Sequence, residues 1–362
     1  MGDPILEIDE LKANFETYEG TANVLDGIDL TIREGEAMAL VGETGCGKSL
    51  TTELILDLVP AAQTSGEIKF KDEIVYSSNV DERSKLRGEN ISIIMQDPMS
   101  SLNPVFTIGE QMTDILLFGG GKKGPIDYLK YKLTRSSAQR REARERAKEV
   151  LNEVQISSPE RVLSSYPSEL SGGMRQRILI GMALLADPDL LIADEPGTAL
   201  DVTTEKKILE ILKNIVDNRN TSVIYITHDL GVAHEVSDRV TVMYAGQVVE
   251  RSPTDVIFDT PMHPYTRALL ESVPSLSTGI GEGSEGSIPS YVDVEAECRF
   301  ADRCEFSEAA CREVYPDERN LEKDQSVACH LYEHDAHGPL DDDIDDTYIG
   351  PPPWKKEQKR AD

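Results

Sequence analysis

The sequence of 362 residues contains no long apolar run, few aromatic side chains and only five cysteines. No segment reaches the roughly 18 uncharged apolar residues that a membrane-spanning helix needs. The N-terminal sequence MGDPILEID has neither the basic region nor the apolar region of a signal peptide. These absences predict a cytoplasmic protein without a membrane span of its own.

Basic residues are also scarce. Lysine and arginine number 37 against 66 aspartates and glutamates, which gives a net charge of −29 and a pI near 4.6. This charge excludes general binding to the phosphate backbone of nucleic acids. The acidic residues are spread along the chain, a pattern typical of a salt-rich cytoplasm in which counterions screen the repulsion. A halophilic source is therefore expected, and an ordinary acidic protein is the alternative.

The clearest motif is GETGCGKS, residues 42–49, which matches the phosphate-binding loop. It follows the apolar run EAMALV and precedes LTTELILDLV, so the loop is expected between a buried strand and a helix N-terminus. Its glycines let backbone N–H groups curl around phosphates, Lys48 reaches the β- and γ-phosphates, and Ser49 ligates Mg²⁺. Cys46 is interpreted as a small filler and not as a nucleophile. The predicted nucleotide-binding residues here are Gly42, Glu43, Thr44, Gly45, Cys46, Gly47, Lys48, Ser49 and Thr51.

A second predicted strand, LLIADEP at residues 190–196, ends in two acids. Ligands of parallel sheets bind at the carboxyl ends of the strands, so Asp194 and Glu195 are expected beside the bound phosphates. Asp194 is predicted to hold Mg²⁺, directly or through water, and Glu195 to polarise the attacking water.

Between these motifs lies LSGGMRQR, residues 170–177, and here the chain resembles the ATP-binding-cassette (ABC) ATPases, whose signature has this form. Ser171, Gly172 and Gly173 open a predicted helix, which provides a second N-terminus for anion binding. The resemblance implies that this N-terminus completes the ATP site of a partner subunit. Two cassettes would then pack head to tail around two nucleotides.

The resemblance also assigns roles to residues outside these motifs. Gln96 matches the loop glutamine that senses Mg²⁺ and the transport partner, Asp201 lies in the loop that crosses the dimer interface, and His228 matches the histidine that contacts the γ-phosphate. Phe15 or Tyr18 supplies the face on which adenine stacks, and the sequence does not choose between them. The predicted catalytic residues are thus Lys48, Gln96, Glu195 and His228, and the predicted Mg²⁺ ligands are Ser49, Gln96 and Asp194.

Longer stretches narrow the resemblance. QDPMSSLNPVFTIGEQ, YPSELSGGMRQR, ADEPGTALDVTTEKKIL and HPYTRALL closely resemble the oligopeptide/dipeptide importer family, within a similarity that covers most of the chain. Gly197 stands where the family usually has threonine, and Glu297 stands where it usually has glycine; these departures concern details of loop geometry and not the expected activity.

Membership of this family implies an ATPase subunit, peripheral on the cytoplasmic face of the membrane, that powers solute import. The implied partners are a second ABC ATPase subunit, either a sister chain or another copy, two transmembrane permeases and, indirectly, an extracellular solute-binding protein. Peptides are the expected solute, with nickel and oligosaccharides as alternatives. A soluble ABC ATPase that is not coupled to transport is the alternative from a different class.

The order of the predicted elements and the resemblance together imply an α/β fold, a P-loop ABC ATPase cassette. We expect a RecA-like parallel-sheet core, an antiparallel β subdomain and a helical signature subdomain at residues 97–175. A basic insertion at 119–139 either contacts the membrane partners or simply extends a helix pair. The predicted parts of the chain are the cassette (1–270), a Gly/Ser-rich linker (271–291), a Cys-rich C-terminal extension (292–335) and a disordered tail (336–362).

Four of the five cysteines gather near the C-terminus, at Cys298, Cys304, Cys311 and Cys329. Disulfides are disfavoured in a reducing cytoplasm, which leaves metal coordination as the main interpretation. Tetrahedral zinc sites usually contain closely spaced CxxC pairs, which are missing here, whereas iron–sulfur clusters accept wider spacings. Members of the importer family carry a similar four-cysteine region, in some cases with a [4Fe–4S] cluster. This cofactor is therefore expected beside ATP and Mg²⁺, and zinc or free thiols are the alternatives.

Overall fold

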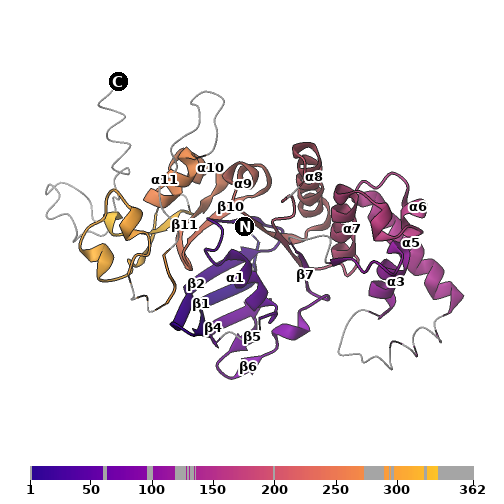
Figure 1. Ribbon diagram of the computed structural model, residues 1–362, viewed down its shortest axis with the longest axis horizontal. Helices are drawn as coiled ribbons and strands as arrows, with labels where there is room; N and C mark the ends of the chain where they lie inside the picture. Colours follow the sequence, from indigo (N-terminus) through magenta and orange to yellow (C-terminus); the bar gives the residue numbers. More distant parts are fainter. Residues whose placement is uncertain are drawn as a thin grey trace.

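The computed structural model describes residues 2–59, 63–95, 101–118, 128, 130, 134, 136–198, 200–272, 289–292, 294, 297–321 and 324–332. A large sheet with flanking helices occupies the middle of the molecule, a group of helices lies at one end, and the cysteine-rich segment lies at the other (Figure 1). A second, antiparallel sheet packs beneath the first.

The central sheet has the strand order β12-β13-β11-β10-β3-β9-β8-β7. Its parallel part consists of β3 (Ala37–Val41), β7 (Ile91–Ile94), β8 (Leu190–Asp194), β9 (Ser222–Thr227) and β10 (Arg239–Tyr244). Every residue of β3 and β9 is buried. Burial on both faces explains why these strands are continuous apolar runs rather than alternating ones.

The antiparallel sheet has the order β2-β1-β4-β5-β6. It is built from β1 (Pro4–Thr17), β2 (Gly20–Arg33), β4 (Gln63–Phe70), β5 (Glu73–Ser77) and β6 (Val80–Asp81). Its apolar face shares one hydrophobic core with α1 (Lys48–Ile55) and the central sheet, to which Leu30, Ile55 and Ile224 contribute. The antiparallel sheet therefore supports the helix that follows the phosphate loop.

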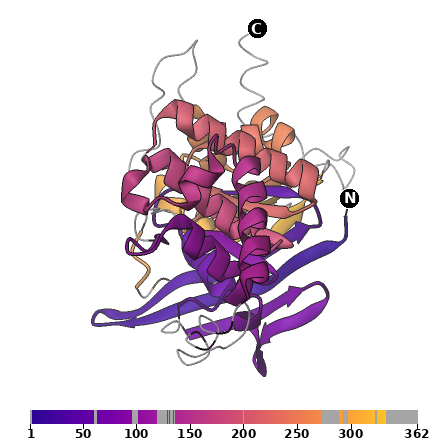
Figure 2. The ribbon, with the colours of Figure 1, turned by 90° about the vertical axis from the view of Figure 1, so that its right-hand side faces the viewer.

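A helical subdomain lies beyond β7 at the edge of the central sheet (Figure 1). It contains α3 (Ile108–Phe118), α5 (Ser137–Glu153), α6 (Pro159–Leu163) and α7 (Gly172–Leu184). A capping box between Ser136 and Gln139 starts α5, whose buried residues recur at helical spacing. These helices share a hydrophobic core with α8 (Val202–Arg219). In the view turned by 90°, they lie above the antiparallel strands (Figure 2).

The C-terminal extension, which we define as the described residues of 289–332, joins the opposite edge of the central sheet. β13 (Ser326–Ala328) pairs with β11 (Gln247–Pro253) and with β12 (Glu318–Asn320). The short helices α9 (Leu230–Val236), α10 (Thr254–Asp259) and α11 (Pro264–Glu271) lie between β9 and the extension in the chain. The extension therefore packs directly on the ATPase core.

This architecture confirms the predicted fold class, an α/β P-loop cassette with an antiparallel sheet and a helical subdomain. The predicted domain limits stay a prediction. Residues 273–288 of the predicted linker, the tail from 336 and most of the 119–139 insertion lie outside the described residues, as does Gln96.

Candidate active site

The phosphate loop connects the buried strand β3 to the N-terminus of α1, as the sequence predicts. Gly47 caps α1 with φ 104°, a conformation that side chains rarely adopt, and a Cβ there would lie 2.6 Å from Leu25. A Cβ on Gly42 would collide with the carbonyl oxygen of Met243. Glycine is therefore required at both positions if the loop is to curl this tightly.

Lys48 is buried inside the loop. Its ammonium donates to the carbonyl oxygens of Gly42 at 2.8 Å and Glu43 at 3.0 Å, so it is held where the loop curls around phosphates. Burial raises the pKa of the neighbouring Cys46 thiol, which fits a neutral filler. Thr51 is also fully buried, and its hydroxyl donates to the carbonyl oxygen of Gly47 within the helix.

Asp194 lies at the carboxyl end of β8, beside the loop. Burial raises the pKa of Asp194, and the nearby Ser49 hydroxyl and Lys48 ammonium partly oppose this shift. Its Oδ1 is buried and has no hydrogen-bond partner among the described residues. A buried carboxylate oxygen without a partner, next to a serine hydroxyl, suits a hard cation such as Mg²⁺.

Glu195 has an unusual backbone and is held by two side chains. Its φ of 42° lies in the left-handed region, which is rare for a residue with a side chain and recurs at functional sites. Nδ1 of His228 is hydrogen-bonded to Oε1 at 2.9 Å, and Thr198 donates to Oε2 at 3.0 Å. Burial acts to raise the pKa of Glu195, but these hydrogen bonds outweigh it and hold the pKa below its ordinary value. The predicted base and the predicted γ-phosphate sensor thus lie in contact.

The signature residues occupy a different part of the molecule. Ser171 caps α7 and accepts a hydrogen bond from Met174 N at 3.3 Å, while Gly172 and Gly173 form the first turn. Asp201 caps the neighbouring helix α8 by accepting from Thr204. In Figure 1, α7 lies among the helices at one end while α1 lies at the centre. The structure therefore does not bring the signature to this chain's own phosphate loop.

The two candidate aromatic residues for adenine differ in exposure. Tyr18 lies fully exposed in the turn between β1 and β2, whereas Phe15 is half-buried in β1 and pairs with Ala22. Only Tyr18 offers a whole ring face to a ligand.

Three side chains that the sequence analysis missed contact the phosphate loop. Tyr265 of α11 accepts a hydrogen bond from Glu43 N at 2.9 Å. Tyr291 donates to the carbonyl oxygen of Gly45 at 2.6 Å, and Arg303 forms a two-pronged ion pair with the Glu43 carboxylate. They are distant in sequence, and no local pattern marks them.

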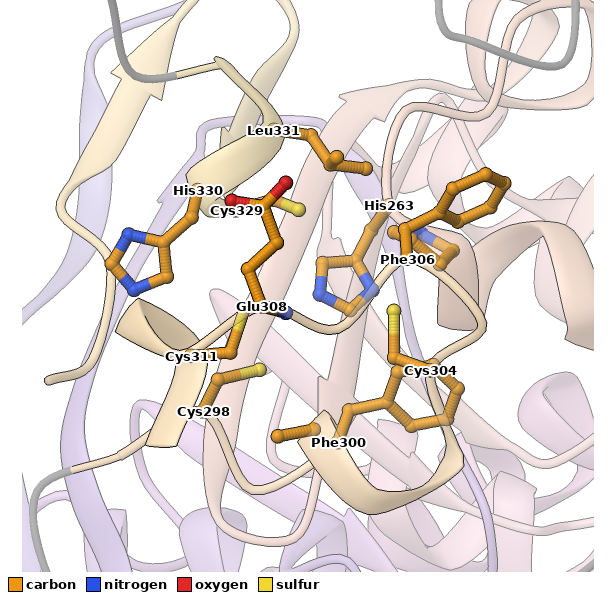
Figure 3. A pocket seen from close by; sticks show the side chains of 12 residues that line it. His263, Cys298, Phe300, Cys304, Phe306, Glu308, Cys311, Cys329, His330 and Leu331 are labelled. Atoms are coloured by element: carbon orange, nitrogen blue, oxygen red, sulfur yellow. Dashed lines mark hydrogen bonds between the residues drawn. The ribbon is translucent and has the colours of Figure 1, made fainter. Parts of the chain in front are cut away.

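The four C-terminal cysteines line one cavity (Figure 3). Its volume is about 20 Å³, enough for about one water. His263, Phe306 and Leu331 also line it. In the part of the chain that the structure describes, no group of three or more His, Cys, Asp or Glu residues is arranged to hold a single metal ion.

A backbone N–H group is directed at one of these sulfur atoms, because Glu308 N lies 3.5 Å from Cys311 Sγ. Burial raises the pKa of the thiols of Cys298, Cys304 and Cys329, that of Cys298 to about 12. These described thiols are therefore expected to stay protonated at neutral pH unless a bound metal centre supplies positive charge. Four thiols are the donor type of an iron–sulfur cluster, but the cavity as it stands has room for about one water.

Within the described residues, none of the helices is long and apolar enough to span a bilayer. The family model described as ABC transporter matches residues 25–198, and the model described as oligopeptide/dipeptide transporter, C-terminal region, matches residues 249–311.

Similar proteins agree with these matches. The oligopeptide transport ATP-binding protein AppD of Bacillus subtilis is 42% identical over 92% of this chain and 98% of its own length. The dipeptide transport ATP-binding protein DppD of the same organism is 41% identical over 94% of this chain and 99% of its own. A dimeric, post-hydrolysis structure of the ATP-binding cassette MJ0796 bound to ADP and Pi covers 69% of this chain and 98% of that chain, with 27% identity and a TM-score of 0.56. The chain therefore belongs to the ABC transporter family, as an ATPase of the branch that carries an oligopeptide/dipeptide transporter C-terminal region.

Proposed function

We propose that the chain is the ATP-hydrolysing subunit of an importer that takes up peptides. The observation that carries this proposal is the combination, in one chain, of the ATP site with a C-terminal region described for oligopeptide/dipeptide transporters. The relatives named for oligopeptide and dipeptide transport match it over nearly their whole length.

Each residue of the site has a definite task in ATP hydrolysis. Lys48 and the N-terminus of α1 would bind the phosphates, and Ser49 and Asp194 would hold a Mg²⁺ ion that offsets phosphate charge. Glu195 orients and polarises the attacking water because its carboxylate is ionised and fixed by hydrogen bonds. His228, at 2.9 Å from Glu195, links this base to the γ-phosphate.

The separation of the signature from the phosphate loop supports a two-chain machine. The N-terminus of α7 has its anion-binding residues far from this chain's own ATP, so they are available to a second ATPase subunit. ATP would join the two subunits and hydrolysis would release them, which moves the permeases to which they are attached. We place the pair, of sister chains or of two copies, on the cytoplasmic face of the membrane, beneath two permeases that receive solute from an extracellular binding protein.

Uptake by cells that lack this chain tests the proposal. Expression of the wild-type chain in these cells should restore import of labelled dipeptides and oligopeptides. Expression of Glu195→Gln should not, because loss of the general base lowers the rate of ATP hydrolysis by about 10²-fold or more. Restored import of nickel or an oligosaccharide in place of peptides would make the solute assignment wrong. Unchanged uptake of all of these, with the chain absent from washed membranes, would instead indicate a soluble ATPase.

We propose further that Cys298, Cys304, Cys311 and Cys329 bind a [4Fe–4S] cluster. Support comes from the convergence of four thiols on one cavity, with the backbone N–H of Glu308 directed at Cys311 Sγ. The four cysteines would hold the cluster through their sulfur atoms, and the cavity, which has room for about one water, would have to widen to receive it.

Metal analysis of the protein purified without oxygen tests this assignment. The expected result is about four irons and four sulfides per chain with a broad absorbance at about 400 nm. Cys311→Ser should lose the iron, whereas Cys46→Ser, at the cysteine in the phosphate loop, should keep it. Colourless protein, or protein with a single zinc, contradicts the cluster.

A further inference from the structure

The C-terminal extension reaches back to the first half of the phosphate loop. Tyr291 donates to the carbonyl oxygen of Gly45 at 2.6 Å. The segment that carries Tyr291 is itself fixed to β2, because Asn23 N donates to the Tyr291 carbonyl oxygen and Val292 bridges to Ala22. A residue near the end of the chain thereby holds the loop backbone in place.

Arg303 makes the strongest of these contacts. Its Nη1 lies 3.0 Å from Oε2 of Glu43, and its Nη2 lies 2.9 Å from Oε1. The arginine side chain is 9% exposed and the Glu43 side chain 30% exposed. The guanidinium also donates to the Tyr244 hydroxyl at 3.2 Å and lies over the rings of Tyr244 and Phe300. Its position is therefore fixed independently of Glu43.

The charge of Glu43 is unfavourable where it lies. Glu43 is the second residue of the phosphate loop, and it lines one cavity together with Thr44 and His228. An uncompensated carboxylate at this position repels the phosphates of ATP. A bidentate arginine removes this repulsion, because it pairs both carboxylate oxygens in a fixed orientation.

We propose that Arg303 is a positioning residue for ATP binding, which neutralises Glu43 and, together with Tyr291 and Tyr265, fixes the first half of the phosphate loop. The simpler explanation is that the ion pair only anchors the extension to the core. The two explanations predict different effects of the Glu43 charge on ATP binding when Arg303 is removed. The inference rests on the ATPase activity of the family and not on what the four thiols hold.

Kinetics of ATP hydrolysis by the assembled complex separate the two explanations. Arg303→Ala should raise the KM for ATP by about tenfold, with kcat changed less than about twofold, because the exposed charge acts on binding. In a Glu43→Gln background the same substitution should raise KM by less than about threefold, because residue 43 then carries no carboxylate that the loss of Arg303 could leave unpaired. Arg303→Lys, which keeps the charge but not the fork, should fall between wild type and Arg303→Ala.

Salt provides a second readout. The KM ratio between Arg303→Ala and wild type should shrink between about 0.1 M and 1 M salt, because salt screens the repulsion. The matched control is Arg312→Ala, which breaks an ion pair of 3.0 Å with Asp302 in the same extension but away from the loop, and should leave KM as in wild type. Equal KM increases in both Glu43 backgrounds, or an increase that salt does not reduce, would show that Arg303 is only an anchor. If Arg303→Ala does not fold, the KM of Arg303→Lys is compared between the wild-type and Glu43→Gln backgrounds, and its salt dependence is measured. The same criteria then decide between the two explanations.

Discussion

The carboxyl group of Glu250 in β11 fastens two later segments of the chain to the central sheet. It is 1% exposed, and it accepts hydrogen bonds from Met262 N at 2.9 Å, His263 N at 2.8 Å and Gln325 Nε2 at 2.9 Å. The first two donors lead into α11, and the third belongs to the extension. We expect Glu250→Ala to loosen both attachments.

The size of the effect follows from the three donors. Each buried donor that loses its acceptor costs about 1–3 kcal/mol, so Glu250→Ala should lower the free energy of unfolding by about 3–6 kcal/mol after partial relaxation. For domains of about 150–250 residues about 1 kcal/mol corresponds to about 2–4 °C, so the Tm should fall by roughly 6–24 °C. Glu250→Gln keeps one acceptor oxygen but turns an NH₂ group toward another donor, so we expect a smaller loss, of about 1–3 kcal/mol.

Thermal unfolding of the purified variants measures these losses. The control is Glu271→Ala, which removes an exposed carboxylate paired with Arg267 at 2.8 Å and should cost less than about 1 kcal/mol. Because α11 carries Tyr265, which accepts from Glu43 N, Glu250→Ala should also weaken ATP binding. A Tm within about 2 °C of wild type would refute the view that Glu250 anchors these segments.

Two further predictions concern the ATP site. Thr198→Val removes a hydrogen bond that helps to lower the pKa of Glu195, so that pKa should rise. The fall of kcat on acidification should then begin about 0.5–1 pH unit higher than in wild type. Identical pH profiles between about pH 4 and 7 would contradict this role of Thr198. Tyr18→Ala should raise the KM for ATP about tenfold by removing the exposed stacking face, while Phe15→Leu should change it little; the reverse result would assign adenine to Phe15.

The parts of the site that could be predicted are those in which neighbouring residues in sequence share one task. The phosphate loop, from Gly42 to Ser49, is continuous and sits between a strand and a helix whose patterns are strong. Asp194 and Glu195 end a buried apolar strand, and parallel strands bring their carboxyl ends together. In both cases local chemistry and the order of elements determine position, so the sequence is enough.

Contacts between distant residues could not be predicted in this way. Tyr265, Tyr291 and Arg303 meet the phosphate loop across separations of 222, 246 and 260 residues. The strands β12 and β13 have three residues each, too short for an alternating pattern, so their addition to the central sheet leaves no sequence signal. The left-handed backbone of Glu195 likewise could not be predicted from the sequence, because glutamate is not enriched at positions with positive φ.

The charges around the loop show how a chain with a net charge of −29 can bind an anion as strongly charged as ATP. At physiological salt a charge is felt over only about 8–10 Å, so the many distant carboxylates matter less than the few near the phosphates. Two acids beside the loop have partners, because Glu43 pairs with Arg303 and Glu195 contacts His228. Asp194 would face the proposed Mg²⁺. The local field at the loop is then set by Lys48 and the N-terminus of α1, which are both favourable to phosphate. Acidity spread over the surface and anion binding at the loop are therefore compatible, provided that the acids closest to the loop stay paired.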